Sequence, residues 1–421
     1  AAGFPMDRVF AQGNNKTERE IHECIEAGVA CFVVDTHEEL DRISKEAVAH
    51  GIEQRVILRI CPGIEADTHA YIQTANEDSK FGFNIRNGAA EAATKYALSL
   101  PGIELSGYHC HIGSQIFELQ SYVEATNTMF SFMNDMKNEL GFVARDYDMG
   151  GGLGIPYTVY DVPATIAQFA RAVTSAIHKN CDKYDYPYPH IYTEPGRSIV
   201  ANAGVTLYTV GSVKEVPGIC TYVAVDGGMT DNIRTALYGS QYEAFVVNNS
   251  ADKPRDMICD VVGKHCESGD VIVKNSPLQH CKAGDIICVL GTGAYCNEMA
   301  SNYNKQVRPG AVLVKDGEVR EIIRRETYDD LLAREQERQQ RSDVWQVERA
   351  HAHGEHRLGR QRNGRRRFHQ HSPEAPRRVS APPGRRSESR QGDHEDALEA
   401  PRARSARGQD RRVLSRDRRR P

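Results

Sequence analysis

Short runs of β-branched and aromatic residues alternate with longer amphipathic stretches over the first 200 residues. The short runs have the length of buried strands, and the stretches at 17–28 and 121–140 have the apolar spacing of helices. This alternation indicates parallel βα units. The expected strands cover residues 8–13, 31–35, 55–60, 105–113, 144–152 and 190–197.

Glycine and polar residues gather where several of these expected strands stop. In a (β/α)8 barrel the active site lies at that rim. The chain offers six such strands, whereas a closed barrel needs eight. We therefore expect residues 1–202 to form a partial barrel and two further units to lie upstream of Ala1.

The sequence pattern changes from about residue 203, where short runs rich in β-forming residues are separated by turn residues. We expect an all-β domain over residues 203–334. The runs that suggest it lie at 204–216, 221–228, 256–266, 285–293 and 311–323.

Charge is distributed unevenly along the chain. The whole sequence carries −4, but the segment from Arg341 onward has 22 Arg, no Lys and 11 acidic residues. The remaining body is therefore strongly acidic, which argues against nucleic acid as its main partner.

The Arg-rich tail, residues 335–421, has too few large apolar residues for a core, so we expect it to be disordered. From Arg341 onward it lacks Lys, Ile, Tyr, Met, Thr and Cys, whose codons are mostly AT-rich, as out-of-frame translation of a GC-rich gene would give. RNA binding is the alternative, but Trp345 and Phe368 are too few aromatic residues for base stacking.

The chain has 11 cysteines and no CxxC pair, so neither a zinc ribbon nor a thioredoxin-like motif is expected. Reduced thiols in the cytoplasm are the simpler interpretation. No apolar run approaches membrane-spanning length, so no membrane partner is expected.

The stretch "HCHIGS" (109–114) carries the first candidate chemistry. His109 and His111 share one face of an expected strand, as a zinc site would require, while Cys110 points to the other side. The same letters fit a nucleophile beside its base, or one wall of a cofactor pocket. The spacing alone leaves all three interpretations open.

Two later strand ends suggest a phosphate ligand. "DMGGGLG" (148–154) offers three glycines whose N–H groups suit phosphate, although glycine runs also make tight turns. In "EPGR", Arg197 suits a phosphate oxygen and Glu194 suits a positively charged ring nitrogen. Pyridoxal phosphate needs both, and His111 would give its flat ring a planar partner.

Six motifs occur in one order: "HCHIGS", "DMGGGLGIPY", "TEPGR", "DGGMTDNIRTALYG", "GKHCESGD" and "GTGAYCNEMASNYN". From residue 1 to about 334 the chain resembles the diaminopimelate decarboxylases, fold-type III enzymes that use pyridoxal 5'-phosphate. The resemblance implies an alanine-racemase-like (β/α)8 barrel followed by a C-terminal all-β domain. The implied reaction converts meso-2,6-diaminopimelate into L-lysine and CO2, the last step of lysine biosynthesis.

The resemblance also implies roles for individual residues. His111 would stack on the cofactor ring, Ser114 would help to hold its phosphate, and Cys266 would give a proton to the carbanion left by CO2. Family active sites form at a homodimer interface, where the neighbouring subunit supplies the cysteine loop. The implied cofactor-binding residues are His111, Ser114, Gly150, Gly151, Gly152, Glu194, Pro195, Gly196, Arg197 and Tyr295.

The implied substrate is a small amino acid whose unreactive end carries a carboxylate and an ammonium. Arg234 and Tyr238 would bind that carboxylate, and Glu267 would accept from the ammonium. A diamine has no distal carboxylate for Arg234, so the buried arginine would stay unpaired and the site would discriminate against diamines. The implied substrate-binding residues are Arg197, Arg234, Tyr238, Glu267, Ser268 and Tyr295.

The chain departs from the family at its beginning. The family carries its Schiff-base lysine in an early motif like Tyr-Ala-x-Lys-Ala-Asn, which is absent here, and residues 1–10 match the family after its first two barrel strands. Lys80, in "SKFG", matches a different family segment. We therefore expect an N-terminally truncated chain with weak or no activity.

Two other functions compete with this interpretation. A metal-dependent barrel hydrolase would use the HxH pair, but it would need His and Asp ligands where later strands carry GGG and EPGR. A non-catalytic relative that binds partners would explain the absent lysine. It would not need to keep Cys266, Glu267, Arg234 and Tyr238.

Overall fold

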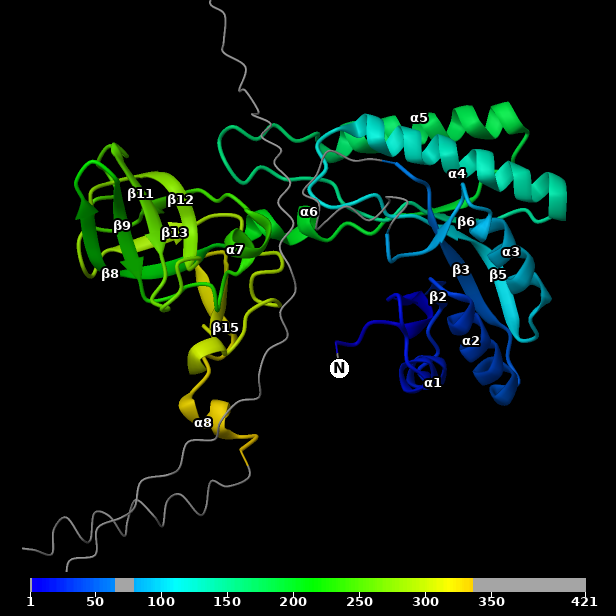
Figure 1. The fold of residues 1–421 in the computed structure, drawn as a ribbon, viewed down its shortest axis with the longest axis horizontal. Coiled ribbons are helices and arrows are strands. Elements are labelled where there is room, and N and C mark those ends of the chain that lie inside the picture. The colour runs from blue at the N-terminus through cyan, green and yellow to red at the C-terminus, as the bar shows by residue number, and fades with distance from the viewer. Residues whose placement is uncertain (1, 65–78, 336–421) are drawn as a thin grey trace, which may run out of the picture. The chain divides into compact units, whose positions relative to one another are not determined.

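The computed structural model describes residues 2–64 and 79–335. Residues 2–203 are built around a seven-stranded sheet with the path β1-β2-β3-β5-β6-β7, in which β4 pairs only with β3 (Figure 1). All of these pairings are parallel. The strands are β1 (Phe10–Ala11), β2 (Cys31–Val34), β3 (Gln54–Cys61), β4 (Phe83–Asn84), β5 (Ile103–His109), β6 (Asp146–Asp148) and β7 (His190–Tyr192). The six expected strands are confirmed, and only the two-residue β4 is new.

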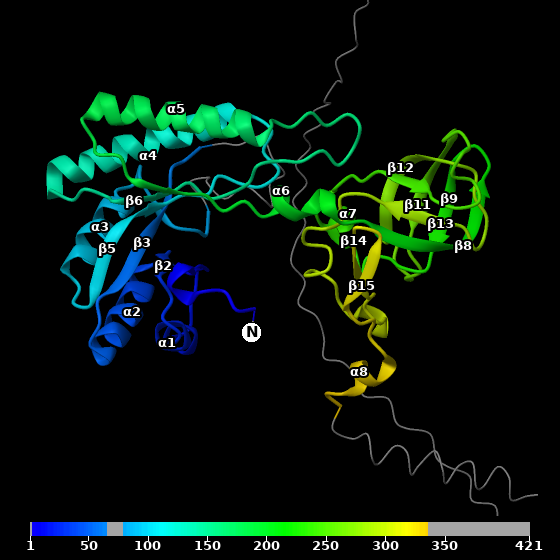
Figure 2. The ribbon, with the colours of Figure 1, turned by 180° about the vertical axis from the view of Figure 1, so that it is seen from behind.

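Five helices connect the parallel strands, as βα units require. They are α1 (Glu18–Glu26), α2 (His37–His50), α3 (Ala89–Ser99), α4 (Leu119–Leu140) and α5 (Ile166–Tyr184), after an initial 3-10 turn η1 (Met6–Arg8). Thr17 and Thr165 begin α1 and α5 with capping boxes, which satisfy backbone N–H groups that the helix itself leaves free. Figure 2 shows α4 and α5 side by side.

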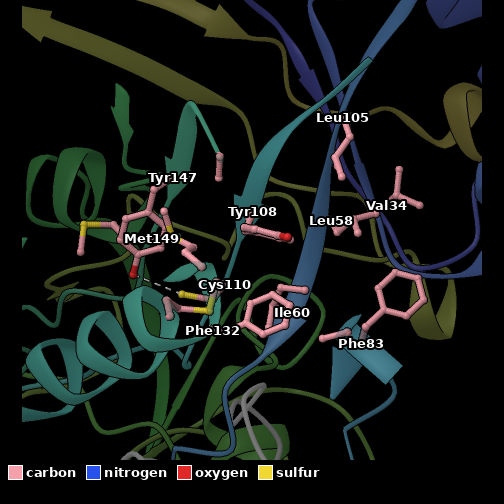
Figure 3. Close-up of a cluster of buried hydrophobic side chains, with 14 of the residues drawn as sticks. Val34, Leu58, Ile60, Phe83, Leu105, Tyr108, Cys110, Phe132, Tyr147 and Met149 are labelled. Atoms are coloured by element: carbon pink, nitrogen blue, oxygen red, sulfur yellow. Dashed lines mark hydrogen bonds between the residues drawn. The ribbon is translucent and has the colours of Figure 1, made fainter. Parts of the chain in front are cut away.

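The core of this part lies between the sheet and its helices. Alternation along β2 sends Phe32 and Val34 into the large cluster that includes the helix residues, and Cys31 and Val33 into a small cluster on the other face. Both faces of the sheet are therefore buried at β2. Figure 3 shows the large cluster near β5 and β6, where Cys110 lies beside Tyr147. Cys110 is therefore a buried core residue.

The sheet does not close on itself within the described residues. Its two edges are β1 and β7, each paired with one neighbour. The parallel part is therefore a half-barrel, in keeping with the expected partial (β/α)8 barrel.

Residues 206–323 form the predicted β-rich part. Six strands follow the order β10-β13-β8-β9-β11-β12, and β14 pairs with β15 in a separate hairpin. The sheet curls because β10 also contacts β12, and Gln279 after β12 accepts a hydrogen bond from the backbone of Val246. The strands are β8 (Thr206–Val216), β9 (Cys220–Val225), β10 (Ala244–Val246), β11 (Met257–Val262), β12 (Val271–Leu278), β13 (Ile286–Val289), β14 (Ala311–Lys315) and β15 (Glu318–Ile323).

The remaining helical turns are short. They are α6 (Arg197–Val200), η3 (Ala201–Ala203), α7 (Arg234–Tyr238), η4 (Tyr303–Lys305) and α8 (Tyr328–Leu332). Of these, α6 and η3 connect the two parts, and α6 and α7 carry site residues. None of the described helices is long and apolar enough to cross a membrane. The domain limits 1–202 and 203–334 stay predictions, and the Arg-rich tail from residue 336 onward lies outside the described residues.

Candidate active site

The motif "HCHIGS" continues from the end of β5 and contributes two imidazoles. His109 is completely buried, and its Nε2 lies 3.2 Å from Oε2 of Glu194. The backbone N–H of Gly151 donates to Nδ1 of His111 at 3.2 Å, which leaves the ring proton of neutral His111 on Nε2. Burial lowers the pKa of both histidines to about 4, so both rings are neutral near pH 7.

The glycine loop after β6 packs tightly against neighbouring strand ends. A Cβ on Gly151 would lie 2.1 Å from the carbonyl oxygen of Glu194, and one on Gly150 would lie 2.6 Å from that of Cys110. Gly152 adds a φ of +104°, which side chains rarely adopt. The three glycines are therefore required here by the close approach of backbone segments, the tight-packing alternative that the sequence left open.

The motif "EPGR" follows β7 and places two charged groups among these loops. The N–H of Glu194 donates to the carbonyl of Gly150 at 2.9 Å, which fixes the carboxylate beside His109. Arg197 begins α6 and donates to Oγ of Ser114 at 2.9 Å and to the hydroxyl of Tyr157. Three strand ends thus hold one another through hydrogen bonds between residues far apart in sequence.

The β-rich part contributes a second arginine and an aromatic ring. The Cζ atoms of Arg197 and Arg234 lie 5.0 Å and 5.3 Å from the centre of the Tyr295 ring. Tyr238 stacks on Arg234 at 5.1 Å. The backbone of Tyr295 has a φ of 69°, in the left-handed region that costs a non-glycine residue free energy and is common at functional sites.

The two guanidinium groups are the electrostatic centre of the site. Arg197 and Arg234 are each only 5% exposed, and the Nε atom of each is buried without a hydrogen-bond partner in the described part of the chain. No ion pair found among those residues joins either arginine to a carboxylate. Burial without a counter-charge is costly, so a pocket of this kind is suited to anions. A cavity between the two arginines is lined also by Gln115, Tyr157, Asp161 and Tyr238.

A carboxylate cluster lies beside the imidazoles. Ligand atoms of His109, Asp148 and Glu194 lie within 4.8 Å of one another, close enough to hold a metal ion. Burial raises the pKa of Asp148 to about 6 and also raises that of Glu194. His111 is not part of this set, so the HxH pair that a metal hydrolase would use does not act as a pair in the described residues.

The predicted residues of the cysteine loop lie elsewhere in the chain. Cys266, Glu267 and Ser268 are all exposed in the connection between β11 and β12. The loop's hydrogen bonds reach other residues of the β-rich part, such as the one that Tyr303 donates to Glu267. In a single copy of the chain the loop is anchored there, and its predicted contribution to a neighbouring subunit stays a prediction.

The sequence reasoning assigned no role in the cofactor site to three of its residues: His109, Asp148 and Tyr157. Asp148 and Tyr157 stand at the two ends of "DMGGGLGIPY", so the motif contained the signal. His109 shares the strand face of His111, but its partner Glu194 is 85 residues away.

Comparisons with known proteins agree with this geometry. Residues 1–201 match the family model described as "Pyridoxal-dependent decarboxylase, pyridoxal binding domain". The chain is 45% identical over 335 residues to "Diaminopimelate decarboxylase" of Bacillus subtilis (strain 168), covering 79% of this chain and 75% of that protein. It is 41% identical over 343 residues to the protein of the same name from Mycobacterium tuberculosis (strain ATCC 25618 / H37Rv), covering 79% and 76%.

Solved structures give the same result. The crystal structure of diaminopimelate decarboxylase from M. jannaschii in co-complex with L-lysine matches with a TM-score of 0.72 and 36% identity, over 79% of this chain and 75% of that chain. The enzyme from Helicobacter pylori complexed with L-lysine matches with a TM-score of 0.72 and 31% identity, over 80% of both chains.

Proposed function

The chain belongs to the diaminopimelate decarboxylases, carboxy-lyases that depend on pyridoxal phosphate, and from this premise we propose that it converts meso-2,6-diaminopimelate into L-lysine and CO2. The observation that carries the proposal is the pair Arg197 and Arg234, two buried cations that have no acidic partner in the described part of the chain and lie 5.0 and 5.3 Å from the centre of the Tyr295 ring. One suits the phosphate of the cofactor, and the other suits the distal carboxylate of the substrate.

The residues present fit the cofactor. Arg197 and Ser114 already bond to each other and offer a guanidinium and a hydroxyl to its phosphate, with Tyr295 alongside. Gly196 leaves room for the Tyr295 hydroxyl, because a Cβ at residue 196 would lie 3.1 Å from that oxygen. Glu194 offers the carboxylate that a protonated ring nitrogen needs, and neutral His111 offers a flat face. The glycines at 150–152 and Pro195 shape the loops that carry these groups.

When bound, pyridoxal phosphate supplies a cationic ring that accepts the electron pair left when the carboxylate departs. The protein's part is to hold that charge in place. Glu194 would keep the ring nitrogen protonated, and His111 would exclude water from one face of the ring without adding a competing charge, because the imidazole of His111 is itself neutral. The carbon that loses CO2 takes up one proton, which we assign to Cys266.

Substrate selection follows from the second arginine. Arg234 and Tyr238 would hold the distal carboxylate, with Tyr295 as a shared wall, while Glu267 and Ser268 would receive the distal ammonium. Since the loop with Cys266 and Glu267 is exposed in one copy, we propose that it completes the site of a second subunit in a homodimer. The cytoplasm stays the proposed compartment, supported by eleven free thiols.

We expect slow turnover from this chain, because no lysine is among the described residues that line the cavity between Arg197 and Arg234. Lys16 is the one buried lysine among the described residues, and its Nζ is held by the carbonyls of Gly13 and Val33 and by Glu39. Borohydride reduction with pyridoxal phosphate, followed by mass spectrometry, should find no stoichiometric adduct on a single lysine. Such an adduct would contradict the expected low turnover.

The anion sites can be tested by binding. Arg197→Gln should weaken pyridoxal phosphate binding, and Arg234→Gln should weaken meso-diaminopimelate binding to the loaded protein, each roughly 10- to 100-fold, as expected when a charged hydrogen-bond partner is lost. Calorimetry would measure both affinities. Arg19→Gln, which removes an arginine 85% exposed on α1, is the matched control and should change neither. Equal affinities in all four proteins would refute the proposal.

A further inference from the structure

His109 is the buried side chain of the site that still lacks a role. It ends β5, is completely buried, and has its Nε2 3.2 Å from Oε2 of Glu194. Its other nitrogen, Nδ1, is buried without a hydrogen-bond partner in the described part of the chain. Burying a polar atom without a hydrogen-bond partner costs free energy, so the contact that His109 makes with Glu194 calls for an explanation.

The geometry restricts the protonation of His109. An imidazolium would place an N–H at Nδ1 with no acceptor, and the Nδ1–H tautomer would in addition set a nitrogen lone pair against the carboxylate. Only the neutral Nε2–H tautomer gives Glu194 a donor and leaves nothing worse than an unused lone pair at Nδ1. Burial, which lowers the pKa of His109 to about 4, acts in the same direction.

Two other groups also act on the Glu194 carboxyl. Burial raises the pKa of Glu194, and the positive charge of Arg59 and a side-chain hydrogen bond with Asp148 lower it. Asp148 accepts the N–H of Gly150 at 2.9 Å, and burial raises its pKa to about 6, so it holds a proton more readily than an ordinary carboxyl. Arg59 of β3 is buried, lies 3.9 Å from Asp35 and stacks on Phe81 at 4.3 Å. His109 adds to these two influences a neutral N–H donor, with its Nε2 3.2 Å from Oε2 of Glu194.

We propose that His109 is a positioning residue whose neutral Nε2–H orients the Glu194 carboxylate and makes it a weaker base, so that a proton between Glu194 and the cofactor's ring nitrogen stays on the ring. This inference rests on the proposed function, because it takes Glu194 to face that nitrogen. A cationic donor would serve worse, since it would neutralise Glu194 and repel the ring cation. A neutral donor holds the carboxylate while leaving its charge for the ring.

The first test needs no cofactor. Nitrogen-15 histidine spectra of the full chain should show one signal, absent from His109→Gln, that stays in the neutral Nε2–H form from pH 8 to pH 5. A His109 signal that carries its proton on Nδ1, or that becomes an imidazolium above pH 6, would overturn the proposal.

The second test reads the cofactor directly. With saturating pyridoxal phosphate labelled with nitrogen-15 in the ring, the apparent pKa of the ring nitrogen should fall by about one to two pH units in His109→Leu, the loss expected for a hydrogen bond to a charged group. His109→Gln keeps an N–H at a similar reach and should fall by less. His280→Leu, the same change at an exposed histidine, is the control and should match the unmodified chain.

The outcomes separate the two proposals. If labelled pyridoxal phosphate binds to both proteins and its ring nitrogen has the same pKa in His109→Leu as in the unmodified chain, the inference is refuted. The proposed function is then unaffected. An unmodified chain that retains no label would refute the proposed function, and the inference with it. A circular-dichroism urea titration on each variant ensures that only folded protein is compared. The smaller effect of His109→Gln separates the lost N–H from a general loss of packing.

Discussion

Gly151 is the residue of the site with the least freedom to change. A Cβ there would lie 2.1 Å from the carbonyl oxygen of Glu194, and a backbone atom cannot move aside as the tip of a flexible side chain can. The position therefore couples the glycine loop after β6 to the motif after β7. Any side chain at residue 151 must push the two strand ends apart.

Gly151→Ala should lower the free energy of unfolding by about 1–3 kcal/mol, the usual cost of overpacking. It should also weaken pyridoxal phosphate binding, because Glu194 moves with its carbonyl. Urea unfolding and calorimetry would measure the two effects. Gly269→Ala adds the same methyl group where nothing lies within 4 Å and should leave both quantities unchanged. An unaltered unfolding midpoint in Gly151→Ala would contradict the packing described for this loop.

His111 gives the site a pH dependence that can be assigned a sign. Its pKa is about 4 in the folded chain, below the ordinary value of 6.5, so the unfolded chain binds a proton first as pH falls. Stability is therefore complete above pH 6.5 and declines as pH falls from 6.5 toward 4. His109 acts in the same direction, whereas the raised pKa of Asp148 opposes it between pH 6 and pH 4.

Replacing His111 with Asn or Phe should flatten this decline by up to one proton, at most about 1.4 kcal/mol per pH unit. Asn can still accept the N–H of Gly151 and Phe cannot, so a flattening common to both comes from titration and not from the hydrogen bond. Urea unfolding at half-unit steps between pH 4.5 and pH 7 would measure the slope. A slope equal to that of the unmodified chain in both variants would show that His111 is not buried neutral.

At the residue scale, the sequence could predict that residues share a site only where these residues stand at the ends of successive parallel strands. Ser114, Gly150–Gly152 and Glu194–Arg197 stand at successive strand ends, and the structure joins them there. The contacts of His109 with Glu194 and of Arg197 with Tyr157 cross 85 and 40 residues. No local pattern encodes such contacts, because they depend on how three loops pack. The assigned roles of these residues stay predictions until binding is measured.

Among the elements, α5 shows how local chemistry sets a boundary. The side chain of Thr165 accepts the N–H of Gln168 at 3.2 Å, and the N–H of Thr165 donates to the side chain of Gln168 at 2.8 Å. Two backbone N–H groups of the helix start are thereby satisfied without tertiary partners. The 19-residue helix begins where it does for this reason.

Thr165→Ala should therefore lower the free energy of unfolding by about 1 kcal/mol. Thr174→Ala makes the same change on the exposed side of the same helix and should instead raise stability by a few tenths of a kcal/mol, through helix propensity alone. Thermal and urea unfolding of the pair would measure the difference. Equal stabilities would mean that the capping box contributes nothing.

The elements that the sequence analysis missed are short or lack a periodic signal. β4 has two residues and β10 has three, too few for an alternating pattern to appear. β12 (Val271–Leu278) is interrupted by the run Lys274–Pro277, and Asn275 has a φ of 51°, so it reads as a loop. The long buried strands and the amphipathic helices were predictable because the burial of particular faces sets the spacing of apolar residues along them.

For the molecule as a whole, the exposed edges of the half-barrel determine how copies of the chain are expected to associate. β7 carries Ile191, which is 40% exposed, and Ile199 and Val200 are exposed a few residues further on. An uncharged edge strand with apolar neighbours is a template for pairing with another chain. We expect copies of the full chain to associate through this edge as the protein concentration rises.

Ile191→Lys should weaken this association by about tenfold, because a charge on an edge strand opposes pairing. Sedimentation velocity over a range of concentrations would measure it. Ile219→Lys places the same charge in the turn before β9, where the isoleucine is 79% exposed, and should have little effect. Association that is insensitive to Ile191→Lys would locate the contact elsewhere.

The approach of two buried guanidinium groups to the one Tyr295 ring has a thermodynamic consequence. Arg197 and Arg234 lie 5.0 and 5.3 Å from the same ring, so each cation contributes to the field at the other. An anion bound at one arginine relieves their mutual repulsion and reduces the attraction left for an anion at the second. By reciprocity the coupling has the same size in both directions. Two separate small anions should therefore bind anticooperatively, and the order in which the two positions fill should not alter the total binding free energy.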